Sequence, residues 1–83
     1  MSNDEKVQWL KFAIAVQEAS LTAHRRAFDD ALKAAGVVID GDGQTRAAKI
    51  DDVRREWMPE IERKKETIAR LQAELRAAEK IAA

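Results

Sequence analysis

The stretch Gly36–Thr45, GVVIDGDGQT, divides the chain in two and decides its fold. It holds all three glycines of the protein, and its Asp-Gly pairs readily adopt the positive φ angles that tight turns need. Residues 2–35 before it contain neither glycine nor proline, and residues 46–81 after it contain one proline and no glycine. We therefore expect one long helix on each side of a turn at about residues 36–45.

The aspartates of this stretch also raise the question of a calcium loop. A loop of the EF-hand kind needs oxygen ligands at positions 1, 3, 5 and 12 and glycine at position 6. Starting at Asp40, with Asp42 at position 3, puts Thr45 at position 6. Starting two residues earlier puts Lys49 at position 12. Neither alignment is complete, so the sequence predicts a turn and no metal site.

The ends of the first helix carry recognisable signals. Ser2 and Glu5 have the spacing of a capping box, in which each side chain satisfies a free backbone N–H of the first turn. Gly36 is expected to end the helix in a left-handed conformation, with Val37 folding back onto Leu32. These signals predict a helix over about residues 3–35.

The second helix is expected over about residues 46–81, with Thr45 as its N-cap. Pro59 lies inside it. Proline removes a backbone hydrogen bond and disfavours helical angles at the residue before it. We therefore expect a kink or a one-residue break near Met58.

Each helix carries an apolar seam with the spacing of a coiled coil. If the chain folds back at the turn, the seams run antiparallel, and facing residues have numbers that sum to about 82. The predicted pairs are Val7–Leu75, Leu10–Leu71, Ile14–Ile68 and Leu21–Ile61, and Gln17 falls near Lys64 and Lys65. The seam residues are Val7, Leu10, Ile14, Gln17, Leu21, His24, Phe28 and Ala31 in the first helix, and Ile50, Trp57, Ile61, Lys64, Ile68, Leu71, Leu75, Ala78 and Ala82 in the second.

The first helix has a second apolar stripe that one partner helix cannot cover. A stripe of this kind is large for a small monomer. A second copy of the chain would cover it by forming a four-helix bundle, and a different protein is the alternative partner. The stripe comprises Trp9, Phe12, Ala13, Val16, Ser20, Ala23 and Ala27.

The composition restricts the classes of function. Eighty-three residues form a single domain, residues 1–83, and the chain has no cysteine for a disulfide. There is no signal-peptide pattern and no apolar run long enough to span a bilayer, so we expect a cytoplasmic protein. The net charge is zero, with 15 basic and 15 acidic residues and no basic arm.

Catalytic and metal-binding patterns are incomplete. Ser20 and His24 lie one turn apart, but a nucleophile pair also needs an orienting acid and an oxyanion site. With one histidine and no cysteine, a zinc or di-iron site cannot be built by one chain. We therefore expect no enzyme activity and no cofactor. His24 is expected to be a packed residue or a pH-sensitive interface residue.

Basic pairs suggest a competing function. Arg25 and Arg26 should lie near Arg54 and Arg55 in an antiparallel hairpin, close to the basic run Arg63–Lys65. Acidic residues are interleaved with them, and pairs such as Glu62–Lys65 and Glu66–Arg70 are typical of a solvated helix face.

The sequence thus predicts an all-α antiparallel hairpin that forms a homodimeric four-helix bundle and binds another protein as an adaptor, assembly factor or small inhibitor. The predicted interface residues are Trp9, Phe12, Val16 and Met58, whereas Trp57 is expected in the core. The alternative is a dimeric nucleic-acid-binding regulator that uses Arg25, Arg26, Arg54 and Arg55.

Overall fold

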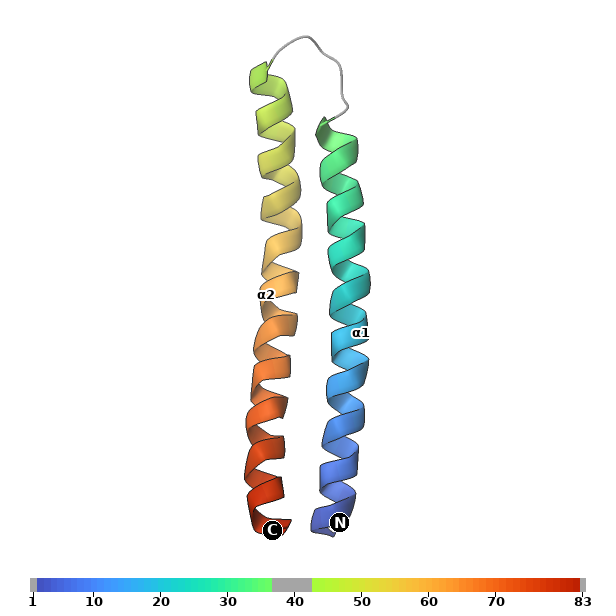
Figure 1. Cartoon of the computed structure of the whole chain (residues 1–83). Helices are drawn as coiled ribbons and strands as arrows, with labels where there is room; N and C mark the ends of the chain where they lie inside the picture. The colour runs from blue at the N-terminus through green and yellow to red at the C-terminus, as the bar shows by residue number, and fades with distance from the viewer. Residues whose placement is uncertain (1, 37–42, 83) are drawn as a thin grey trace.

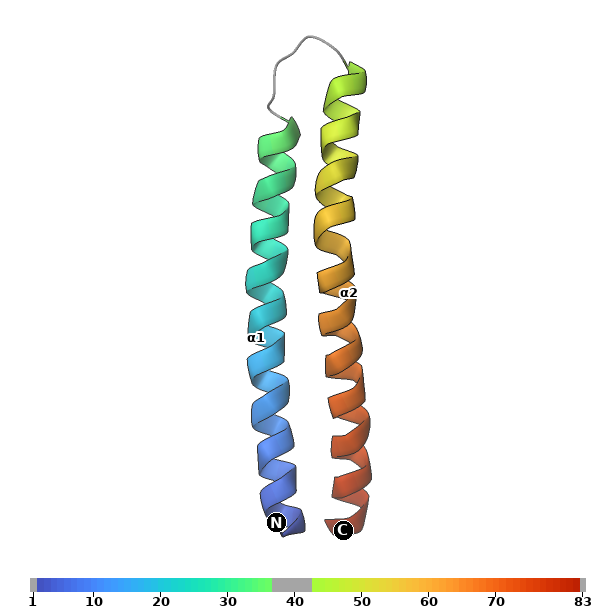
Figure 2. The ribbon, with the colours of Figure 1, turned by 180° about the vertical axis from the view of Figure 1, so that it is seen from behind.

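Two long helices lie side by side in a computed structural model of the chain, which describes residues 2–36 and 43–82. Helix α1 spans Asn3–Gly36 and helix α2 spans Gly43–Ala82. They run antiparallel, so that the start of α1 and the end of α2 lie at the same end of a rod of 62 × 16 × 15 Å (Figures 1 and 2). Within the described ranges there is no strand. The structure is therefore the all-α helical hairpin that the sequence predicts.

Helix α1 begins as predicted but ends differently. The backbone N–H of Glu5 donates to Oγ of Ser2 at 3.2 Å, which is the N-cap interaction. The last helical residue is Gly36, and its φ does not lie in the left-handed region. The predicted left-handed ending at Gly36 is therefore wrong, because glycine adopts helical angles as well as left-handed ones. The predicted contact of Val37 lies outside the described residues.

Helix α2 begins at Gly43, so Thr45 lies within its first turn and is not the N-cap. The residue at which a helix starts depends on one or two local side chains, so the sequence defines it less well than the helix itself.

Pro59 lies inside α2, and the helix continues on both sides of it. Of the two predicted forms, the one-residue break near Met58 is therefore absent. Pro59 is exposed, so water can reach the carbonyl that loses its N–H partner at this turn. A single missing hydrogen bond is tolerated because the turns before and after it hold the helix in place.

Hydrophobic residues facing the partner helix form two separate core clusters. The first cluster has Ala13 and Leu75 packed against it, and the second has Phe28 and Met58. Ala35 is also buried. The first cluster consists of Val7, Leu10, Ile14, Leu71 and Ala78, and the second of Leu21, Ile61 and Ile68.

Contacts between the helices fix their register. The side-chain amide of Asn3 donates to the backbone carbonyl of Ala78 at 2.9 Å, and the rings of His24 and Trp57 lie 4.9 Å apart. Both pairs have numbers that sum to 81, within one residue of the prediction. The two helices therefore pair in the predicted register.

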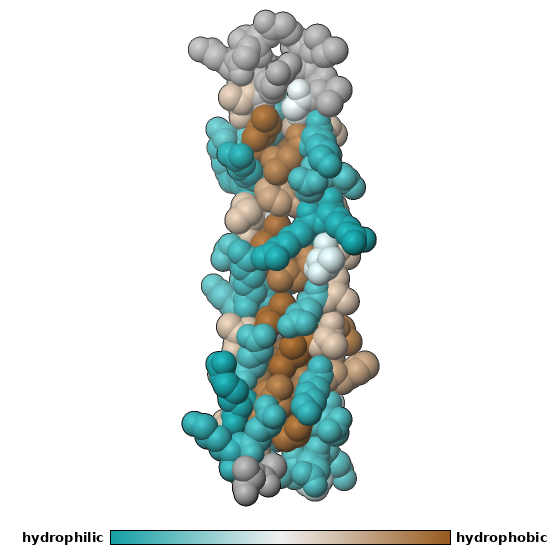
Figure 3. All heavy atoms as spheres, viewed as in Figure 1, coloured by the Kyte–Doolittle hydropathy of each residue, from teal (hydrophilic) through white to brown (hydrophobic). Residues whose placement is uncertain are grey.

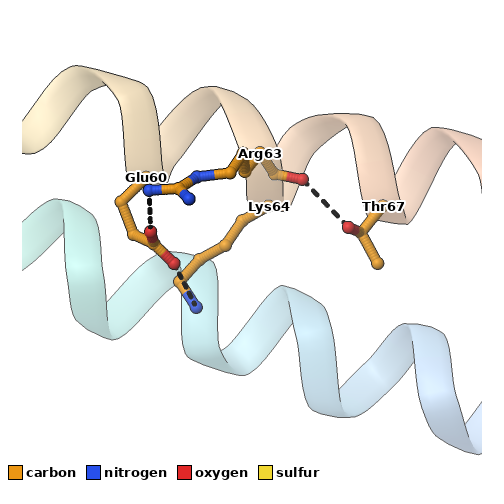
Figure 4. A network of polar contacts seen from close by, with 4 residues as sticks. All are labelled: Glu60, Arg63, Lys64 and Thr67. Atoms are coloured by element: carbon orange, nitrogen blue, oxygen red, sulfur yellow. Dashed lines mark hydrogen bonds and ion pairs between the residues drawn. The ribbon is translucent and has the colours of Figure 1, made fainter.

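Polar residues interrupt the seam on both helices: Gln17 lies between the two clusters on α1, and Lys64 lies between Ile61 and Ile68 of the second cluster on α2. Gln17 on α1 is half-buried, and the side chain of Lys64 on α2 is 21% exposed. Nζ of Lys64 lies 4.0 Å from Oε1 of Glu60, and Oε2 of Glu60 lies 2.6 Å from Nη2 of Arg63. Figure 4 shows the side chains of Glu60 and Lys64 extending from α2 toward α1. Hydrophilic side chains also border the hydrophobic line between the helices in Figure 3.

Candidate protein-interaction face

The outer face of α1 exposes large hydrophobic side chains. The exposed fraction is 53% for Trp9, 69% for Phe12 and 48% for Val16. These three residues follow one another at helical spacing, and small residues continue the same face toward the turn. Ala13 was expected on this stripe, but it packs against the first core cluster. We define the outer face of α1 as Trp9, Phe12, Val16, Ala19, Ser20, Ala23 and Ala27.

This face carries no charge along its length. Eighteen residues separate its ends, which corresponds to about 27 Å along the helix axis. Charged residues appear on the same side one turn beyond each end, at Glu5 and Asp30. The outer face of α1 is therefore a long uncharged surface with charged ends, and its hydrophobic bulk lies in the half nearest the N-terminus.

The outward side of α2 has the opposite character. Ion pairs along the helix join Asp52 to Arg55 at 3.6 Å and Glu62 to Lys65 at 3.4 Å. Pairs at such exposed positions contribute little stability. The predicted pair Glu66–Arg70 is absent from the described ion pairs. Among the large hydrophobic side chains described on α2, only Ile81 is exposed. Of the four large hydrophobic side chains that are exposed in the described part of the chain, three therefore lie on α1.

Met58 does not join this surface. It is half-buried and packs against the second core cluster, so its predicted position off the seam is wrong. Because the helix continues through Pro59, the position next to Trp57 stays at the edge of the seam. A long, flexible methionine side chain can then reach the cluster. Its part in an interface stays a prediction, whereas Trp9, Phe12 and Val16 lie together as expected.

An aromatic cluster occupies the seam near the turn. Trp57 is half-buried, stacks on Phe28 at 6.4 Å between ring centroids, and lies tilted against His24 at 4.9 Å. Nε2 of His24 is buried without a hydrogen-bond partner. His24 and Trp57, together with Glu56 and Glu60, line a shallow pocket of about 290 Å³. Trp57 therefore lies on the seam, where it contacts His24 and Phe28, but it is half-buried and belongs to neither core cluster, so its predicted place in the core is reached only in part.

The structure offers no assembled catalytic or metal centre among the residues it describes. No hydrogen bond between Ser20 and His24 is present there, and no group of three or more metal-ligating side chains comes together. The two aspartates of the possible calcium loop, Asp40 and Asp42, lie outside the described residues.

The four arginines of the alternative site are all exposed. The contact between His24 and Trp57 brings Arg25 and Arg26 to the same level of the hairpin as Arg54 and Arg55. Arg55 is paired with Asp52, whereas the other three form no ion pair with any described residue. The nearby Asp29 lies 3.1 Å from Lys33, and the hydrogen bond between them raises the pKa of the Lys33 ammonium.

Comparison with known proteins gives no relative for this arrangement: no family model, no curated protein and no solved structure matches the chain. Within residues 2–36 and 43–82, neither helix contains a segment that is long and apolar enough to cross a membrane.

Proposed function

We propose that the protein is a non-enzymatic protein–protein interaction module, an adaptor, assembly factor or small inhibitor, that binds through the outer face of α1. The observation that supports this proposal is the exposure of Trp9, Phe12 and Val16 on an uncharged helix face. An exposed apolar patch is typical of an interaction site, and tryptophan is enriched among the residues that contribute most to binding.

A homodimer with the arrangement of a four-helix bundle is the assembly that we propose. Among the described residues, the core of one hairpin consists of nine buried hydrophobic residues, eight of them in two clusters. Small cores of this kind stabilise a chain weakly, and an oligomer is a common way to complete them. A second chain would also remove the exposed aromatic side chains from water, which is favourable by about 25 cal/mol per Å² of apolar surface.

Light scattering at micromolar concentration tests the proposal. The wild type should have twice the chain mass. Trp9→Glu should shift the protein to the monomer, because it places a charge in the apolar face. Lys80→Glu is the matched control, because it changes charge on an exposed position of α2 and should leave the mass unchanged. Equal masses for the two variants would contradict a role for the outer face of α1 in association.

Nucleic-acid binding is the second candidate function. Three exposed arginines, Arg25, Arg26 and Arg54, lie at one level of the hairpin without ion-pair partners among the described residues, as phosphate-binding residues would. Affinity for nucleic acid falls steeply with salt, whereas apolar helix binding does not.

Two variants separate these functions. One replaces Arg25, Arg26, Arg54 and Arg55 by glutamine, and the other replaces Phe12 and Val16 by serine. Circular dichroism should first show that both remain helical. If only the arginine variant loses binding to a generic DNA duplex, and wild-type affinity falls steeply with salt, the nucleic-acid function replaces the one proposed here.

A further inference from the structure

We infer that the outer face of α1 is covered by the same face of a second copy, with the two α1 helices antiparallel and the two Val16 side chains at the two-fold axis. This inference rests on the proposed function, because it names the partner and the contact of that same face. It assigns residues to facing positions, which can be tested individually.

The first observation is the difference between the two helices. Exposed large hydrophobic side chains cluster on α1, whereas the outward side of α2 carries ion pairs such as Asp52–Arg55 and Glu62–Lys65. Burying these charges in a dimer would be costly unless each were fully paired. The contact between copies is therefore expected mainly between the two α1 helices, with both α2 helices farther from the two-fold axis.

The second observation is how large and small side chains are distributed along the outer face of α1. Its large residues, Trp9 and Phe12, lie in the N-terminal half, and its small residues, Ala19, Ser20, Ala23 and Ala27, lie in the C-terminal half. In an antiparallel pair centred on Val16, facing residues have numbers that sum to 32. Each large residue then meets small ones on the second copy.

The facing positions allow knobs-into-holes packing. Trp9 lies at the level of Ala23 of the second copy, with Ser20 and Ala27 one turn to either side. Phe12 lies at the level of Ser20, next to Ala19. Small residues at these positions leave space for the aromatic rings and let the backbones approach. A parallel pair would instead place Trp9 against Trp9 and leave the alanine half poorly packed.

The third observation is the charge at the ends of the face. In the antiparallel arrangement Glu5 lies at the level of Ala27 of the second copy, beside Arg26. Arg26 is exposed and forms no ion pair with a described residue of its own hairpin. A parallel pair would place Glu5 against Glu5, which is unfavourable. Antiparallel helices also bring opposite ends of the two helix dipoles together.

Single cysteines test the arrangement, because the chain has none of its own. Val16→Cys should form a disulfide-linked dimer under mild oxidation, since the two positions would face each other within disulfide reach. Ala27→Cys is the matched control on the same face. Its copies would lie 22 residues apart along the axis, about 33 Å, and should cross-link at least about tenfold more slowly. Circular dichroism checks that both variants remain helical.

A charge exchange gives an independent readout. Glu5→Arg and Arg26→Glu should each weaken the dimer about two- to fivefold, as expected for exposed ion pairs. The double variant should regain the lost affinity, because the attraction is restored with reversed signs. Sedimentation equilibrium measures the three dissociation constants.

The outcomes distinguish this inference from the proposed function. Rapid cross-linking of Val16→Cys alone, together with recovery in the double variant, supports the antiparallel pair. Equal cross-linking of both cysteine variants shows a parallel pair, which overturns the inference while association through the face stands. A monomeric wild type in which neither variant cross-links overturns the second copy as partner. The proposed function then fails only if substitutions in Phe12 and Val16 leave binding to a foreign protein unchanged.

Discussion

Leu10 is the residue on which the first core cluster depends most. It is completely buried between the helices, with Val7 and Ile14 on its own helix and Leu71 and Ala78 on the other. Its position follows from the spacing of the seam, since residues at threes and fours lie on one side of a helix. Because the cluster is small, few neighbours can move to fill a space left by a shorter side chain.

Replacing Leu10 by alanine should therefore lower the free energy of unfolding by about 3 kcal/mol, within the range observed for buried leucines. Urea unfolding followed by circular dichroism measures the change. Ile81→Ala is the control, because that side chain is 76% exposed and should cost less than about 0.5 kcal/mol. A loss below about 1 kcal/mol for Leu10 would show that the cluster is loosely packed.

Ser2 caps the start of α1. Its Oγ accepts from the N–H of Glu5 at 3.2 Å, and its carbonyl accepts from the N–H of Lys6 at 3.0 Å. Ser2→Ala should lower the free energy of unfolding by about 1 kcal/mol, as expected for loss of an N-cap. Thr22→Ala removes a hydroxyl from an exposed position inside α1 and should be neutral or slightly stabilising. Thermal unfolding of both variants decides whether the cap contributes.

At the scale of the elements, helix spacing proved more informative than local signals at the ends. The apolar period predicts two helices and their register, because every turn of the seam repeats the same information. The interhelical contact of Asn3 with Ala78 agrees with that register. The ends depend on single residues with close alternatives, and Gly36 and Thr45 were both misassigned. The position of Met58 was misjudged as well, because the seam spacing placed it off the seam, whereas it packs against the second core cluster.

The candidate site was predictable to a similar degree. Exposed Trp9, Phe12 and Val16 follow from a second apolar stripe that one partner helix cannot cover. The pocket beside His24 and Trp57 was not predicted, since it depends on how side chains of two helices meet. The seam placed His24 and Trp57 in facing positions, and that was the available signal.

Pro59 tests whether α2 acts as one continuous element. An exposed proline inside a helix costs up to about 3 kcal/mol relative to alanine, because one N–H bond is lost. Pro59→Ala should therefore raise the free energy of unfolding by about 1–3 kcal/mol. Gln72→Ala, at another exposed position of α2, controls for helix propensity and should change it by less than about 0.5 kcal/mol. Unchanged stability in Pro59→Ala would show that the proline starts a separate helical segment.

At the scale of the whole molecule, the two helices differ in the surface that they expose. The seam buries one side of each helix, the outward side of α2 is charged, and the outer face of α1 remains apolar. Gln17 and Lys64 interrupt the seam at one level. Polar residues at matching positions oppose other registers, because sliding one helix would place Lys64 against an apolar neighbour. The hairpin thus gains a defined register at some cost in stability.

A protein built in this way should depend on its own concentration for stability. If folding and dimerisation are coupled, a tenfold increase in concentration should raise the apparent free energy of unfolding by about 1.4 kcal/mol per mole of dimer. Urea midpoints measured by circular dichroism at several concentrations test this. Phe12→Glu, which places a charge in the outer face of α1, should abolish the dependence and unfold at lower urea. Lys80→Glu should retain it.

A wild-type midpoint that does not move with concentration would mean that one hairpin is stable with Trp9 and Phe12 exposed. In that case the outer face of α1 is kept for a different protein, and its two aromatic side chains are the residues to substitute when that partner is sought.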